Sequence, residues 1–253
     1  MLSSFSVYLC NVLVSPYSAG LYSSFVQVQS LFLALVNSLV SSFVPVILKS
    51  YASNDSSIFY TTIEKYMKIM SVIVSPAISI VLVFAIPFFS LWLGFSMEEH
   101  KFVIYLMLLT AGLSFPFEVM NQGLVAKNYM KKPAIITLIL GLVNIFLAYI
   151  LSIGFGWDLF GIVFAQMLAN ILRSWIVIPL SLGSGFTLQT RSLYKSSLMI
   201  IIVMVSCFIL VLFFFYALPP INDWISLSLS IGGAVILVYG FDYFCLCRRF
   251  LRF

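Results

Sequence analysis

The chain has very few charged residues. Only 8% of its 253 residues are Asp, Glu, Lys or Arg, whereas 62% are hydrophobic and the mean hydropathy is +1.14. A soluble domain carries roughly 25% charged residues, so this composition excludes that class and predicts a chain solvated mostly by lipid. The 13 basic residues outnumber the 8 acidic ones. Because they flank apolar segments and form no single basic face, no nucleic-acid partner is expected.

Catalytic and ligand-binding motifs are also missing. The sequence contains neither a G-x-x-x-x-G-K-[ST] phosphate loop nor a G-x-S-x-G nucleophile motif, which argues against nucleotide hydrolysis of that type and against acyl transfer. The single histidine, His100, follows Glu98 and Glu99 in a short polar stretch, and the four cysteines lack metal-ligand spacing. We therefore expect no enzymatic activity, no cofactor and no metal, and we interpret the stretch around His100 as a solvated loop.

Seven apolar segments are long enough to cross a bilayer as helices, which takes about 20 residues each. They cover residues 21–48, 67–93, 102–125, 133–153, 158–182, 196–218 and 224–245. An eighth segment, 1–14, would be only about 21 Å long and too short to span. The sequence predicts an all-α polytopic membrane protein, a helical bundle of about seven full transmembrane helices plus a truncated N-terminal one. We expect the coding sequence to begin partway through a span that a longer protein would complete.

The basic residues alternate along the chain between the apolar segments. Eleven of the 13 fall in every second gap, and the gaps between these hold only Lys101. The basic gaps contain Lys49, Lys65 and Lys68, then Lys127, Lys131 and Lys132, then Arg191 and Lys195, and finally Arg248, Arg249 and Arg252. Short loops rich in Lys and Arg stay on the cytoplasmic side. The pattern predicts a multi-pass protein of the cytoplasmic (plasma) membrane whose C-terminus is cytoplasmic.

Polar side chains inside the apolar segments are the candidate functional residues, because polar groups in hydrocarbon usually face a bundle interior or a watery cavity. In segment 21–48 they fall within an arc of about 140°, and two further clusters each share a helix face. The candidates for a transport cavity are Gln27, Asn37, Lys68, Glu118, Asn121, Gln122, Gln166, Asn170 and Arg173.

A purely structural role for these residues remains open. Ser, Asn and Gln also hold membrane helices together through hydrogen bonds, and the long side chain of Arg173 can extend to the membrane surface. The similar depths of Glu118 and Arg173 predict an ion pair between them. Gly161, Ala165 and Ala169 recur every fourth residue, which predicts close approach of a neighbouring backbone.

Prolines and one weakly polar segment complete the expectations for packing. Pro76 and Pro87 in one span and Pro116 in the next predict kinks. Segment 196–218 contains Ser206 as almost its only interior polar residue, so it is expected to face lipid at the periphery.

The order of these segments resembles the C-terminal half of polysaccharide and O-antigen (Wzx-like) flippases, within the multidrug/oligosaccharidyl-lipid/polysaccharide exporter superfamily. The matching features are Ala19-Gly20-Leu21-Tyr22, Pro45, Leu91-Trp92-Leu93-Gly94, Asn144 and Gly161-Ile162-Val163-Phe164-Ala165. The resemblance covers nearly the whole chain. It implies that residues 1–182 form the C-terminal lobe of a 14-helix flippase, and that residues 196–253 supply two peripheral transmembrane helices and a basic cytoplasmic tail.

The resemblance also implies a function. Members of the family move a lipid-linked oligosaccharide or polysaccharide precursor to the outer leaflet by alternating access, in a cavity between two bundles. The implied partners are membrane lipids, a lipid-linked glycan and an N-terminal half-transporter or a second copy of the chain. Arg173 and Lys68 would favour an acidic headgroup, and Glu118 is the implied coupling-ion site.

Two alternatives remain. One is half of an ion-coupled exporter of drugs or cations, although Glu118 is the only acid well inside a span. The other is a non-transporting membrane scaffold or gene remnant, motivated by the short first helix.

Overall fold

The computed structural model describes residues 2–53, 55–183 and 187–242, and over these ranges the chain forms helices and no β-strand. Six helices in this part of the chain are long and apolar enough to cross a membrane, and a seventh span results when one bent pair of helices is counted as a unit. The prediction of an all-α polytopic membrane protein is confirmed. The predicted end of the last span at residue 245 and the three terminal arginines lie outside the described residues.

The first span is shorter than predicted and starts earlier. Helix α2 covers Pro16–Ser41, and its N-terminus is capped by Ser15, whose hydroxyl accepts a hydrogen bond from the Ser18 backbone N–H. A separate helix, α3, covers Val44–Ala52 and has Pro45 in its first turn. The predicted single segment 21–48 was therefore wrong at both ends, because a capping serine and a proline outweigh continuous hydrophobicity. The predicted short helix at 1–14 is present as α1, Leu2–Leu13.

Two helices extend beyond the apolar segments from which they were predicted. Helix α4 covers Ser56–Leu93 and begins 11 residues before the predicted start. Asp55 caps it, accepting hydrogen bonds from the backbone N–H groups of Ser57 and Ile58. Helix α10 covers Leu188–Tyr216 and is capped by Thr187. Both extensions are more polar than the apolar segments, so an argument from apolar length could not find them.

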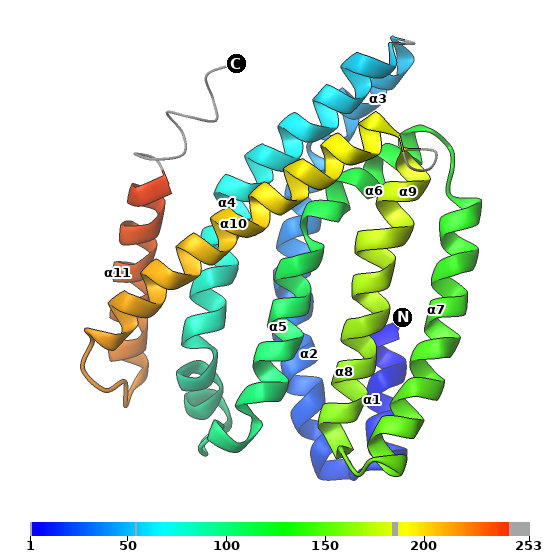
Figure 1. The fold of residues 1–253 in the computed structure, drawn as a ribbon. Helices are drawn as coiled ribbons and strands as arrows, with labels where there is room; N and C mark the ends of the chain where they lie inside the picture. Colours follow the sequence, from blue (N-terminus) through cyan, green and yellow to red (C-terminus); the bar gives the residue numbers. More distant parts are fainter. Residues whose placement is uncertain (1, 54, 184–186, 243–253) are drawn as a thin grey trace.

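The third span is broken, as Pro116 predicted. Helix α5, Lys101–Ser114, and helix α6, Pro116–Ala126, meet at a bend of 44°. Helix α4 contains both Pro76 and Pro87 without losing its helical continuity, and it changes direction along its length (Figure 1). Proline removes a backbone donor and clashes with the preceding turn, which accounts for the bend at Pro116.

The next two spans carry short π-helical stretches. Helix α7, Lys131–Tyr149, continues into the π-helix η2, Ile150–Gly154, and helix α8, Asp158–Ile171, continues through η3, Leu172–Val177, into α9, Ile178–Leu182. Gly161 of α8 packs directly on η2. A Cβ built on Gly161 would lie 2.9 Å from the Leu151 carbonyl carbon and 2.9 Å from the Ser152 nitrogen. The predicted close approach of a neighbouring backbone is confirmed at this glycine.

Helices α4 and α10 pack along each other across the molecule (Figure 1). The most apolar part of α4 is 72% buried, against 28% for α10, so α4 is central, and α10 is peripheral as predicted for segment 196–218. Helix α11, Trp224–Asp242, packs on both of them. Together the three helices enclose a second apolar cluster, separate from the main core, which includes Val83 and Phe84 of α4 and Cys207 of α10.

The chain connections lie at two ends of the bundle (Figure 1). We call the end with α3, the start of α4, the end of α6 and the start of α10 the basic end. It carries the lysines and arginines of the predicted basic gaps within the described residues: Lys49, Lys65, Lys68, Lys127, Lys131, Lys132, Arg191 and Lys195. The opposite end carries the 3-10 helix η1, Glu98–His100, and the 217–223 connection between α10 and α11.

Candidate functional site

Helix α2 places its polar side chains on the outside of the bundle. Its buried stripe is almost entirely apolar and consists of Ala19, Leu21, Tyr22, Phe25, Gln29, Phe32, Val36 and Val40. The opposite face, which we call the outward polar face, contains the exposed residues Gln27, Ser30, Asn37, Ser38 and Ser41, with Leu31 and Leu35 among them. Neither Gln27 nor Asn37 is hydrogen-bonded to another described residue.

The other exposed helix faces are different in character. The exposed face of α7 contains Ile135, Leu138, Ile139, Leu142, Val143 and Phe146. That of α10 contains Leu198, Ile202, Val205, Ile209 and Phe213. Such faces are suited to lipid, which offers no hydrogen bonds to polar groups. Compared with these two faces, the outward polar face of α2 is better suited to water or to a polar ligand.

A smaller polar site lies inside the bundle between α2, α5 and α8. The hydroxyl of Tyr22 donates a hydrogen bond to Oε1 of Gln166, and Nε2 of Gln29 donates to the carbonyl of Met107 at 3.0 Å. Beside them is a cavity of about 10 Å³, lined by Gln29, Met107, Thr110, Val163, Gln166, Met167 and Asn170. This volume suits about one water molecule. The site is too small for a transported headgroup, and its hydrogen bonds join three helices.

A third group of polar side chains surrounds the bend between α5 and α6. Glu118 lies in the first turn of α6, and its carboxylate interacts with the side chains of Arg173 and Asn121. Arg173 lies in the π-helix η3, and the rings of Phe117 and Trp175, 4.9 Å apart, join α6 to η3. Among the described side chains, Glu118 and Arg173 do not form a direct ion pair. The prediction of a direct ion pair was therefore wrong, although the two charged side chains lie near each other.

The nine predicted cavity residues thus do not form one site. Gln27 and Asn37 are exposed on α2, Gln166 and Asn170 line the small cavity, and Glu118, Asn121 and Arg173 gather at the bend. Lys68 of α4 and Gln122 of α6 are half-buried. The sequence had grouped Arg173 with Gln166 and Asn170 on one helix face, but Arg173 does not line their cavity and lies instead near Glu118.

Two polar residues of the interior site, Tyr22 and Gln29, were missed. The available signal was their position within the apolar stripe of α2, at spacings of three and four residues from Phe25 and Phe32. A polar residue on such a stripe needs a hydrogen-bond partner, and a long side chain such as Tyr or Gln can reach one on a neighbouring helix. No group of three or more His, Cys, Asp or Glu side chains positioned to hold a metal occurs in the described part of the chain.

Comparison with known proteins supports a membrane protein without deciding a family. The chain is 28% identical over 170 residues to a protein of Bacillus subtilis (strain 168) described as the uncharacterized membrane protein EpsK. The match covers 67% of the chain but 34% of that protein, so the chain spans about a third of its relative's length. No family model matches the chain. No solved structure matches it either.

Proposed function

We propose that this chain is the C-terminal bundle of a flippase, which moves a lipid-linked oligosaccharide or polysaccharide precursor across the cytoplasmic membrane by alternating access. It works with a second bundle, supplied by an N-terminal half-transporter or by a second copy of the chain. The basic end lies on the cytoplasmic side, because loops rich in Lys and Arg are retained there. The observation that carries the proposal is the outward polar face of α2.

Lipid cannot solvate this face at an acceptable cost. Serine hydroxyls can bond to their own helix, as Ser41 does to the carbonyl of Ser38 at 2.7 Å. The amides of Gln27 and Asn37 have no such partner, and each would cost about 1 to 3 kcal/mol if buried unpaired. A water-filled cavity between α2 and a facing bundle removes this cost. It also gives a sugar headgroup the polar route across the membrane that its hydroxyls require.

The helix irregularities suit a bundle that changes conformation. A 44° bend separates α5 from α6, and the span from Asp158 to Leu182 is interrupted by η3. Bent or broken helices and π-helical turns recur at functional sites in transporters. Arg173 and Lys68 are the cations proposed to meet an acidic sugar or a diphosphate, and Glu118 is proposed to bind the coupling ion.

The length of the relative agrees with a two-part transporter. About two thirds of the Bacillus subtilis protein lies outside the matched segment. That length leaves room for a second bundle in a protein of this kind. Our proposal therefore assigns transport to the complete assembly and not to the isolated chain.

Transport of a fluorescent lipid-linked glycan in proteoliposomes tests the proposal. The chain is reconstituted with its partner half, and the fraction of headgroups reaching the other leaflet is followed by impermeant quenching. We expect the double variant Gln27→Leu, Asn37→Leu to slow transport about tenfold or more, because two polar contacts worth about 1 kcal/mol each are lost. Ser228→Leu, on the exposed face of α11, is the matched control and should transport normally.

Three outcomes would count against the proposal. If the double variant and the control transport equally fast, the outward polar face of α2 does not line the route. If the assembly protects cells from toxic amphiphiles and moves no glycan, the chain belongs to a drug exporter. If no partner half exists and the chain alone moves nothing, the scaffold or remnant interpretation is favoured.

A further inference from the structure

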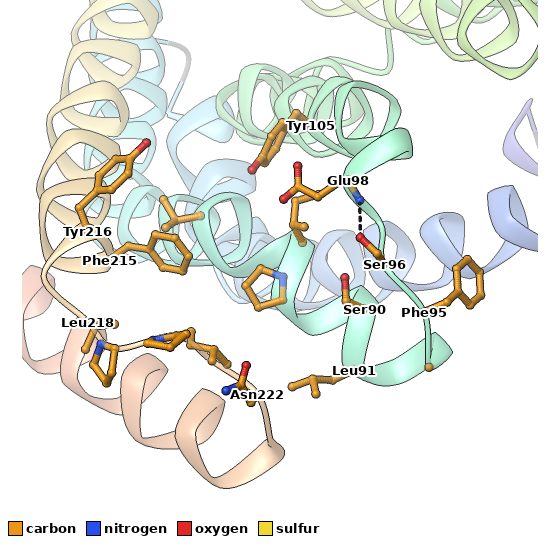
Figure 2. A pocket seen from close by; sticks show the side chains of 17 residues that line it. Ser90, Leu91, Phe95, Ser96, Glu98, Tyr105, Phe215, Tyr216, Leu218 and Asn222 are labelled. Atoms are coloured by element: carbon orange, nitrogen blue, oxygen red, sulfur yellow. Dashed lines mark hydrogen bonds between the residues drawn. The ribbon is translucent and has the colours of Figure 1, made fainter.

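A large pocket opens at the end of the bundle opposite the basic end. It has a volume of about 760 Å³ and lies between the α4–α5 connection and the α10–α11 connection (Figure 2). Ligand sites for small molecules typically occupy about 300 to 1,000 Å³. The polar groups that line it are Ser90, Ser96, Glu98, Tyr105, Tyr216 and Asn222. None of its lining residues comes from α2, so it is separate from the outward polar face.

The tryptophans at this end of the bundle indicate that the pocket lies near the depth of lipid headgroups. Three of the four tryptophans occur at this end, and Trp92, Trp157 and Trp224 are between 41% and 48% exposed. Tryptophan and tyrosine gather at the boundary between hydrocarbon and water. A headgroup held in the pocket would therefore keep its lipid chain in the adjacent leaflet.

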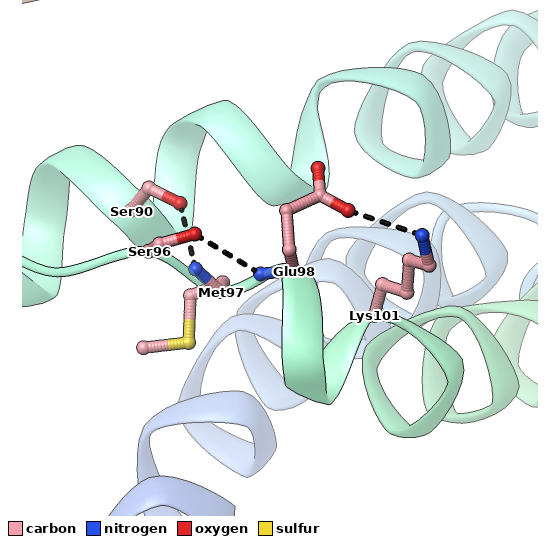
Figure 3. A network of polar contacts seen from close by, with 5 residues as sticks. All are labelled: Ser90, Ser96, Met97, Glu98 and Lys101. Atoms are coloured by element: carbon pink, nitrogen blue, oxygen red, sulfur yellow. Dashed lines mark hydrogen bonds and ion pairs between the residues drawn. The ribbon is translucent and has the colours of Figure 1, made fainter.

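Glu98, which the sequence placed in a solvated loop, lies on the wall of the pocket and is held in position. Its backbone N–H donates to the Ser96 hydroxyl at 3.5 Å, and Lys101 Nζ donates to Glu98 Oε2 at 3.1 Å (Figure 3). The Ser90 hydroxyl in turn accepts from the backbone N–H of Met97 at 3.1 Å. No hydrogen bond engages the other carboxylate oxygen, Oε1, within the described residues, which leaves it able to accept one from a ligand.

The remaining walls combine rings with neutral polar groups. Figure 2 shows the Tyr105 hydroxyl and the Glu98 carboxylate directed toward each other, with Phe215 pointing into the middle of the pocket and Asn222 at its far side. The rings offer apolar faces, while hydroxyl, amide and carboxylate groups offer both donors and acceptors. Glu98 is the only charged lining residue. Its ion-pair partner Lys101 does not line the pocket, so a bare phosphate headgroup would meet no cation on the described walls.

We infer that this pocket binds the sugar headgroup of a glycolipid on the side of the membrane opposite the basic end. A sugar ring presents an apolar face to aromatic side chains and hydroxyls to Glu98, Tyr105 and Asn222. This inference rests on the proposed function, because a flippase delivers such a headgroup to this side. The pocket is then a holding site for the translocated sugar, outside the transport route along α2.

Photocrosslinking of the full-length chain in phosphatidylglycerol nanodiscs tests the inference. One probe is a monoglucosyl lipid with a diazirine on the sugar, and the matched probe is a phosphocholine lipid with the diazirine in its headgroup. We expect the sugar probe to label the pocket and Glu98→Gln to reduce that labelling about tenfold, as loss of a hydrogen bond to a charged acceptor would do. Glu99→Gln, an exposed neighbour outside the pocket, should label normally.

A second variant controls for effects on folding. Asn222 is exposed and its side chain makes no hydrogen bond to the described residues, so Asn222→Trp fills the pocket without removing an internal contact. It should abolish labelling while keeping the unfolding temperature of the parent. Equal labelling by both probes, or labelling unchanged in both variants, would overturn the inference. If the parent chain shows no sugar-specific labelling of the pocket but transports the glycan normally, the pocket inference alone is refuted. Specific labelling without transport would refute the proposed function alone.

Discussion

Replacement of Gly161 by alanine tests the packing of α8 against η2. The new Cβ would lie 2.9 Å from two backbone atoms, in Leu151 and Ser152. Backbone atoms cannot rotate aside as a side-chain end can, so the helices must separate. Overpacking of this kind costs about 1 to 3 kcal/mol. A rigid neighbour places this site in the upper half of that range.

The helix propensity of alanine works in the other direction. Glycine is about 1 kcal/mol less favourable than alanine within a helix. The net loss in the free energy of unfolding is therefore about 1 to 2 kcal/mol, which corresponds to a decrease in unfolding temperature of about 2 to 8 °C. Gly20→Ala is the matched control. Gly20 lies in α2 with no heavy atom within 4 Å of its added Cβ, so it should be neutral or slightly stabilising.

A thiol-reactive dye can measure both variants in detergent. The Cys10 and Cys207 thiols are buried, so they react only as the bundle unfolds. The background should lack Cys245 and Cys247, which lie outside the described residues. If Gly161→Ala unfolds at the same temperature as the parent, or above Gly20→Ala, the close approach of α8 to η2 does not limit the packing.

Three further predictions concern single contacts. Lys127→Met should lower the unfolding temperature by several degrees. Lys127 Nζ donates to the carbonyl of Leu182 at 2.6 Å, and a hydrogen bond from a charged donor contributes about 1.5 to 3 kcal/mol. An unchanged unfolding temperature would show that this hydrogen bond does not stabilise the bundle. Tyr22→Phe leaves the Gln166 amide without its partner and should destabilise by about 1 to 3 kcal/mol in the same assay, whereas a neutral effect would show that the contact is dispensable. Hydrogen bonds from the start of α11 hold the pKa of Asp223 below its usual range. Its capping contribution is therefore present at neutral pH and is lost as the pH falls through that lowered pKa. Over this pH range the protection of the start of α11 from hydrogen exchange should decrease, and protection that does not change with pH would contradict the cap.

The number and order of the spans could be predicted from the sequence because lipid imposes a simple length requirement. The bend at Pro116 was predictable from the chemistry of proline. Helix ends were not, since Asp55 and Thr187 cap helices whose first turns are polar and lie before the apolar segments. Hydrophobicity carries no information about such polar turns.

The sequence identified the polar residues within the spans, but it did not predict where their side chains point. Helical periodicity correctly separated Gln27 and Asn37 from the apolar stripe of α2. It could not show that this face points away from the bundle while Gln166 points into it, because that depends on which neighbours α2 packs against. Glu98 illustrates the same limit: a loop residue in the sequence becomes part of a pocket through a connection more than 100 residues away.

Water accessibility along α2 tests the central claim most directly. In a background without the four native cysteines, Gln27→Cys and Leu142→Cys place single thiols near the midpoints of α2 and α7, both on exposed faces. In the complete assembly in a native membrane, a hydrophilic thiol reagent should modify the cysteine at position 27 readily and the lipid-facing one at position 142 hardly at all. Equal, slow modification at both positions would mean that the outward polar face of α2 does not line an aqueous cavity, and it would contradict the account.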